Sequence, residues 1–191
     1  VSGQTPTELE FEAALSSVKF TNTSDTPAAT DRVVAFRVTD PSGAGNATSA
    51  AVNQTVTLTP TNDRPTVALG SQTPGFTELD GSDTGANAVV VNSAVAITDL
   101  DGTNPLSATV TITNAKTGDQ LLFTNTAKIT GSYDTGTGVL TLTKVSGQSP
   151  TELEFEAALS SVKFNNTSDT PDSTDRVVAF RVTDPSGAGN A

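Results

Sequence analysis

The sequence predicts an all-β protein made of β-sandwich repeats, with one short helical crossover in each repeat. Three observations lead to this prediction. Residues 1–47 recur almost unchanged at 145–191, an offset of 145 − 1 = 144 residues. Short segments of alternating apolar and polar residues follow one another roughly every 8–12 residues, separated by turn formers. Apolar residues make up only 35% of the chain, which suits a thin core rich in β-branched side chains.

The repeat points to a mechanical or scaffolding role. A fixed period of near-identical segments indicates an array in which one folded unit is copied end to end. Catalysis needs one well-built site, whereas spanning a distance needs many interchangeable units. The copies differ only at Thr5/Ser149, Thr21/Asn165, Ala28/Asp172 and Ala29/Ser173.

The first copy contains one predicted helix, followed by strands. Residues 8–17 place apolar side chains near helical spacing, and their early glutamates favour the first turn of a helix. The residues that follow alternate as strands do, and the last of these strands shows a one-residue slip that indicates a β-bulge. The predicted strands are 18–22, 31–40 and 51–60, with a turn at 40–46.

The middle of the chain continues as short strands before the copied helix and strands return. Gly, Asn and Asp punctuate these segments, and no helical pattern separates them, which excludes a parallel α/β fold. Phenylalanines on the copied strands are predicted core residues, namely Phe20, Phe36, Phe164 and Phe180. The predicted extended segments are 66–69, 88–92, 94–102, 107–114, 120–125, 127–134 and 138–144.

A linker at residues 61–64 is predicted to divide the chain. Asn-Asp precedes Pro65 there, and an extended run restarts at Thr66. Residues 1–60 are then the C-terminal half of a first repeat, and 65–191 form a second repeat that lacks its last strand. We expect either that the chain is a piece of a longer array, or that the halves pair between molecules by strand donation.

The composition limits the classes of function. A net charge of −11 argues against binding to nucleic acid or to anionic lipid, because both need a basic surface. The acidic surplus serves either solubility or cation binding. The chain has no His and no Cys, so Ser/His/Asp and Cys/His catalysis are impossible, and we expect no enzymatic activity.

Acidic residues near predicted strand ends form the candidate metal site. Asp99 and Asp101 share one face in extended geometry, and Gly102 lets the chain turn after them. Two carboxylates about 4 Å apart repel by roughly 4 kcal/mol at a surface-like dielectric, so such a cluster is costly without a cation. These residues either bind Ca²⁺ or only cap turns. The candidates are Asp40, Asn62, Asp63, Glu78, Asp99, Asp101 and Asp184.

The order of phrases along the chain resembles a known family. TNDRP follows a C-terminal strand, and ITDLDG, SATVTIT, GDQLLFTN, ITGSYDTGTGVLTLT, FEAALSSVKF and DRVVAFRVTDPSG occur in the family's order. Together they resemble the cadherin-like (Ig-like) tandem repeats of giant bacterial RTX-type surface adhesins. The linker lacks the longer acidic run of cadherins, and no glycine-rich nonapeptide repeats occur.

The resemblance implies a Ca²⁺-bound, Ig-like sandwich that acts as an extender on the bacterial cell surface. It implies that Ca²⁺ is held by Asn62, Asp63, Glu78, Asp99 and Asp101. Asp40 and Asp184 are added to this set of candidate ligands. The expected partners are neighbouring repeats of the same chain, with no nucleic acid and no direct membrane contact. Two alternatives are a self-assembling extracellular filament that uses strand exchange, and a glycan- or protein-binding module.

Overall fold

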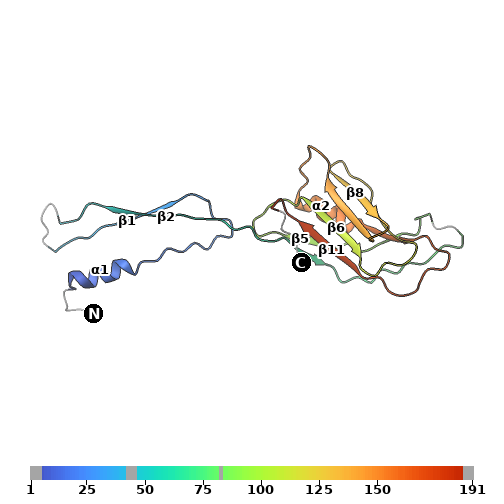
Figure 1. Ribbon diagram of the computed structural model, residues 1–191, viewed down its shortest axis with the longest axis horizontal. Coiled ribbons are helices and arrows are strands. Elements are labelled where there is room, and N and C mark those ends of the chain that lie inside the picture. Colours follow the sequence, from blue (N-terminus) through green and yellow to red (C-terminus); the bar gives the residue numbers. More distant parts are fainter. Residues whose placement is uncertain (1–5, 42–46, 82–83, 187–191) are drawn as a thin grey trace. The chain divides into compact units, whose positions relative to one another are not determined.

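A computed structural model describes residues 6–41, 47–81 and 84–186. The chain divides into two compact units, Val1–Thr61 and Asn62–Ala191, here called unit 1 and unit 2. The described residues form antiparallel strands and two short helices, so the predicted all-β class is confirmed (Figure 1). Neither described helix is long and apolar enough to cross a lipid bilayer.

Between residues 62 and 186, the part of unit 2 that the structure describes (with a gap at 82–83) forms three antiparallel sheets, with strand orders β4-β10-β7, β11-β6-β9-β8 and β3-β5. The helix α2 follows β9 and precedes β10, as expected of a helical crossover. The elements are β3 (Thr66–Leu69), β4 (Val89–Val90), β5 (Val95–Thr98), β6 (Ser107–Ile112), β7 (Asp119–Leu122), β8 (Ile129–Asp134), β9 (Val139–Lys144), α2 (Glu152–Ser160), β10 (Lys163–Asn166) and β11 (Val178–Thr183).

One hydrophobic core joins these elements of unit 2. Every second side chain of β6 is buried, which is the pattern of a strand with one face on a core. Buried residues of β5, β7, β8, β9, β11 and α2 belong to the same core. The four-stranded sheet therefore faces a second layer that includes α2 and β7, in a sandwich-like arrangement.

The helix α2 is fixed by a local signal and by burial. The Thr151 hydroxyl accepts a hydrogen bond from the Glu154 N–H, and the Glu154 carboxylate accepts one from the Thr151 N–H, which is a capping box. Phe155, Ala158 and Leu159 follow helical spacing and are buried in the core. The cap defines where the helix begins, and its apolar side holds it against the sandwich.

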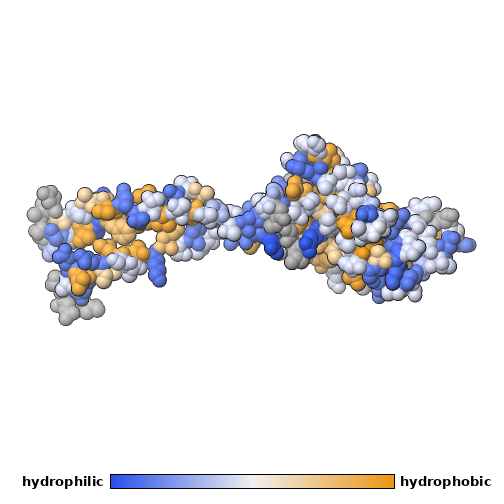
Figure 2. Space-filling model, viewed as in Figure 1, coloured by the Kyte–Doolittle hydropathy of each residue, from blue (hydrophilic) through white to orange (hydrophobic). Residues whose placement is uncertain are grey.

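Unit 1 repeats this sequence without the burial. Its elements are α1 (Glu8–Ser16), β1 (Arg32–Phe36) and β2 (Val52–Val56), and β1 pairs with β2. The capping box recurs at Thr7 and Glu10, yet α1 buries no side chain. Phe11 is 46% exposed, whereas its copy Phe155 is 0% exposed. Figure 2 shows apolar residues at the surface of unit 1.

Two predictions for the first copy are wrong. Residues 18–22 form no strand, although the copied residues form β10. The reason is that β10 lies between β4 and β7, and the described residues of unit 1 (6–41 and 47–61) include no equivalent of either strand. For the same reason Phe20 is 44% exposed, while its copy Phe164 packs against the core.

The predicted bulge lies just before β2. The Ser49 N–H donates to the Val38 carbonyl, and further along the ladder Phe36 pairs with Val52. One strand advances by 38 − 36 = 2 residues while the other advances by 52 − 49 = 3. One extra residue therefore lies opposite Arg37, which confirms the β-bulge.

The duplicated helix offers a matched test of burial. We expect Phe155→Ala to lower the free energy of unfolding of unit 2 by about 3–5 kcal/mol, because it leaves a cavity in the core. We expect Phe11→Ala to change stability by less than about 0.5 kcal/mol, because Phe11 is about half exposed and lies in no core. Denaturant unfolding followed by circular dichroism measures both, and equal losses would contradict the exposed state of α1.

Candidate metal centre and apolar pocket

Pairing within unit 2 brings together several of the acids selected from the sequence. Thr66 at the start of β3 lies opposite Thr98 at the end of β5, so the linker residues before Thr66 lie beside the loop that follows β5. The end of β11 joins the same region, since β11 also packs against β3. The residues gathered there are Asn62, Asp63, Asp99, Asp101 and Asp184, here called the linker cluster.

Hydrogen bonds connect the members of the linker cluster. The Asp63 N–H donates to Oδ2 of Asp101 at 2.5 Å, and Nδ2 of Asn62 donates to Oδ2 of Asp184 at 2.7 Å. The Asp101 N–H donates in turn to Oδ1 of Asp99 at 2.9 Å. Both linker residues are thereby tied to carboxylates that unit 2 holds on two other loops.

Asp184 is the most buried carboxylate of the linker cluster, with 0% of its surface exposed. The Ser186 N–H and hydroxyl donate to its Oδ1 at 2.9 and 2.5 Å. A buried carboxylate is tolerated only where hydrogen bonds or opposite charge compensate its lost hydration. Its copy Asp40 lies in unit 1, where the side chain is exposed and the N–H donates to the Ala47 carbonyl.

Sequence reasoning missed two further carboxylates near the linker cluster, those of Glu152 and Glu156. Burial raises the pKa of Glu152, and the negative charges of Glu156 and Asp99 raise it further. Glu152 and Glu156 are four residues apart, which places them on one side of α2. The Ile97 N–H donates to Oε1 of Glu156 at 2.7 Å, so this side of the helix faces β5. The spacing was visible in the sequence, but the strand that the helix contacts was not.

Glu78 does not join the linker cluster. It is exposed and lines the pocket described below, together with Asp172 and Arg176, which precede β11. Asp184 follows the other end of that strand. Across residues 6–41, 47–81 and 84–186, no three acidic side chains are gathered in a geometry that can hold a metal ion as they stand. The oxygen donors of the linker cluster are nevertheless the kind that Ca²⁺ prefers.

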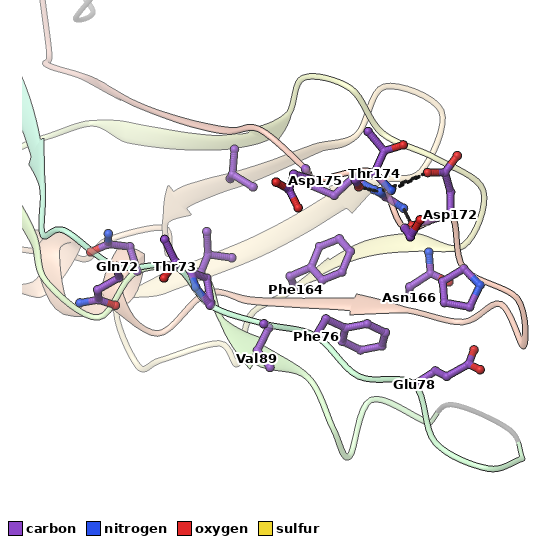
Figure 3. A pocket seen from close by; sticks show the side chains of 18 of the residues that line it. Gln72, Thr73, Phe76, Glu78, Val89, Phe164, Asn166, Asp172, Thr174 and Asp175 are labelled. Carbon is purple, nitrogen blue, oxygen red and sulfur yellow. Dashed lines mark hydrogen bonds and ion pairs between the residues drawn. The ribbon is translucent and has the colours of Figure 1, made fainter.

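An apolar pocket of about 660 Å³ opens beside the first residues of β11. The rings of Phe76 and Phe164 meet edge to face, with centroids 5.5 Å apart, and Figure 3 shows them with Val89 inside the pocket. Val178 and Phe180 of β11 line it as well. Polar residues line it too, among them Glu78, Asp172, Asp175 and Arg176.

A buried ion pair holds the loop beside this pocket. Nε of Arg176 lies 2.6 Å from Oδ2 of Asp119, whose side chain is fully buried. Nδ2 of Asn166 and the Lys116 N–H also donate to that carboxylate, each at 2.7 Å. Arg176 further donates to the carbonyls of Asp172 and Thr174. The loop that carries two of the differences between the copies, Asp172 and Ser173, is thereby fixed to the sandwich.

The raised pKa of Glu152 gives a test of the electrostatics. A carboxyl whose pKa is higher in the folded chain binds its proton more tightly there, so stability falls as pH rises from the ordinary pKa through the raised one. We expect Glu152→Gln to raise the melting temperature at pH 7 in chelator. We also expect it to remove the fall in stability as the pH rises.

Glu154→Gln is the matched control on the same helix. The hydrogen bond from Lys128 and the backbone bond from Thr151 lower the pKa of Glu154, so its carboxylate contributes stability above the ordinary pKa. Its replacement is expected to lower the melting temperature. Thermal unfolding between pH 4 and 8 measures both variants, and a lower melting temperature for Glu152→Gln would contradict the crowding of negative charge.

Comparison with protein-family models, with curated proteins and with solved structures finds no match to this chain. The family resemblance carried by the sequence phrases therefore stays an expectation. What bears on function is the linker cluster, the apolar pocket and the repeat itself.

Proposed function

We propose that this chain is a structural extender segment of a bacterial cell-surface adhesin. Its repeats are Ig-like, cadherin-like sandwiches that Ca²⁺ makes rigid at their junctions, so that they project a distal ligand-binding region away from the cell. The observation that carries the proposal is the linker cluster, in which Asn62 and Asp63 are bonded to Asp184 and Asp101 of unit 2.

The chemistry of the linker cluster suits a hard divalent cation. Ca²⁺ takes six to eight oxygen ligands, and carboxylates, amide oxygens and loop carbonyls supply them. Asp63, Asp99, Asp101 and Asp184 would hold the ion, and a half-turn of the Asn62 amide would present its oxygen in place of the nitrogen that now donates to Asp184. A bound cation would also relieve the repulsion that raises the pKa of Glu152.

The mechanical effect follows from where the linker cluster lies in the chain. The chain passes from unit 1 into unit 2 through Asn62 and Asp63. An ion bound to both residues would hold this linker in one direction. Without the ion, single hydrogen bonds hold these residues, and water competes for each of them. Extracellular Ca²⁺ modules bind with dissociation constants of about 10⁻⁴–10⁻³ M, which suits a site that fills outside the cell.

A binding module is the second candidate function. The apolar pocket with its polar residues has the composition of many ligand sites. Two of its lining residues, Asp172 and Ser173, stand where the other copy has Ala28 and Ala29. A glycan array probed with the whole chain distinguishes this candidate, because a dose-dependent signal would favour it over the extender.

Calcium binding should stabilise unit 2 and depend on the linker cluster. At a Ca²⁺ concentration 100 times the dissociation constant, we expect the free energy of unfolding to rise by about 2.7 kcal/mol. We expect Asp101→Asn to weaken Ca²⁺ binding by about tenfold or more, because it removes the negative charge of one ligand. Isothermal calorimetry and thermal unfolding in Ca²⁺ and in chelator measure these changes.

Glu78→Gln is the matched control, because it removes one negative charge outside the linker cluster and should leave the affinity unchanged. Small-angle scattering in Ca²⁺ and in chelator tests the mechanical role, and we expect a larger maximum dimension with Ca²⁺. An unchanged dimension together with an unchanged melting temperature would contradict the proposal. Equal losses of affinity in both variants would place the ion elsewhere.

A further inference from the structure

Two of the four differences between the copies lie at the apolar pocket. Asp172 and Ser173 line it, and the first copy has Ala28 and Ala29 at these positions. The exchange adds a carboxylate and a hydroxyl to the lining. It does not alter the apolar side chains that the same segment contributes, because these are identical in the two copies.

The charges that line the pocket are unbalanced. Glu78, Asp172 and Asp175 supply three carboxylates, and Arg176 is the one cation among the described residues of the lining. The Arg176 side chain is 10% exposed, and its Nε is paired with the buried carboxylate of Asp119. Its Nη1 lies 4.0 Å from Oδ1 of Asp172, at the limit of an ion pair. Asp119 already balances the charge of Arg176 from outside the lining, so the pocket presents a net negative charge.

Asp172 keeps its negative charge at neutral pH. Hydrogen bonds from the hydroxyl and the N–H of Thr174 lower the pKa of its carboxyl, and the charges of Lys116 and Arg176 lower it to a smaller extent. The Thr174 nitrogen lies 2.8 Å from Oδ1 of Asp172. The Asp172 side chain is also 46% exposed, so a ligand in the pocket can reach it.

The apolar and charged parts of the pocket lie at different places along it. The rings of Phe76 and Phe164 form its apolar middle. In Figure 3, Glu78 and Asp172 lie toward one end of these rings, and Gln72 lies toward the other. The volume of about 660 Å³ is within the range of small-molecule sites, roughly 300–1,000 Å³. A ligand whose apolar body contacts the rings can therefore place a charged head at the two carboxylates.

We propose that the apolar pocket binds a small organic cation, an apolar ring or chain that carries an ammonium or guanidinium group. Its body contacts Phe76 and Phe164, and its cationic head is held by the carboxylates of Glu78 and Asp172. The proposal names a ligand class for the second candidate function and rests on that function. It does not depend on the linker cluster, so the calcium proposal is tested separately.

Charge selects the cation over other ligands of the same shape. Contact with the phenylalanines favours any apolar body of the right size, whatever its charge. A cation also gains attraction to the carboxylates, and this attraction is stronger beside an apolar wall than in open water. The faces of the phenylalanine rings attract cations as well. A neutral sugar gains none of this attraction, and an anion is repelled.

Three indole ligands of nearly the same shape test the role of charge. Tryptamine carries an ammonium group, tryptophol a hydroxyl and indole-3-acetate a carboxylate. The chain has no Trp, so indole fluorescence reports the ligand alone, and its anisotropy measures binding without a label. In chelator, we expect tryptamine to bind about fivefold or more tightly than tryptophol, and indole-3-acetate to bind more weakly than either.

Variants of the pocket test where the cationic head lies. Asp172→Ala together with Ser173→Ala gives the second copy the residues of the first. We expect this pair to weaken tryptamine binding by about threefold or more and to leave tryptophol binding unchanged, because only the charge is lost. Glu78→Gln should act in the same way. Asp101→Asn is the matched control, because it removes a negative charge outside the pocket and should leave tryptamine binding unchanged.

The two proposals fail separately, because Asp101→Asn is expected to weaken Ca²⁺ binding alone and Glu78→Gln tryptamine binding alone. Absence of tryptamine binding, or equal affinity for the three indoles, would overturn the cation proposal. Tryptamine binding that neither acidic variant weakens would overturn it as well. A glycan that binds where tryptamine does not would leave the second candidate function in place and overturn only the cation. Binding of the peptide Lys-Trp-Lys without binding of tryptamine would replace the small molecule by a basic protein segment.

Discussion

The duplicated segment buries its apolar side chains only where residues 65–144 supply a second layer. Val162 and Val182 are 0% exposed in unit 2, whereas their copies Val18 and Val38 are 57% and 42% exposed. Local sequence is the same in each pair, so the difference measures the tertiary contribution alone. Helix capping needs no such layer, because both copies have the capping box. The rest of the structure follows from this dependence, including the strand that forms in only one copy.

Local patterns predicted the elements well, and contacts between elements poorly. The helix, the bulge before β2 and most strands of unit 2 could be read from alternation and turn residues, since these signals lie within a few residues of each other. The failure at Phe20 has another cause, because β10 exists only between strands supplied by a different part of the chain. The candidate site divides in the same way. Pairing of β3 with β5 gathers the linker cluster, leaves Glu78 outside and adds Glu152, and none of this is visible without the topology.

The exposed apolar side chains of the first copy also bear on how the chain folds as it is synthesised. Residues 1–47 leave the ribosome before residues 65–144, and the second copy follows last. The early copy is therefore the first to meet residues 65–144, which the late copy needs as its second layer. Competition of this kind between similar segments favours misassembly in repeat proteins. One difference between the copies matters here, because Asn165 is 1% exposed and its Oδ1 has no hydrogen-bond partner among the described residues, whereas the first copy has Thr21. The order of synthesis thus favours the early copy, whereas in the folded chain the late copy packs in the core.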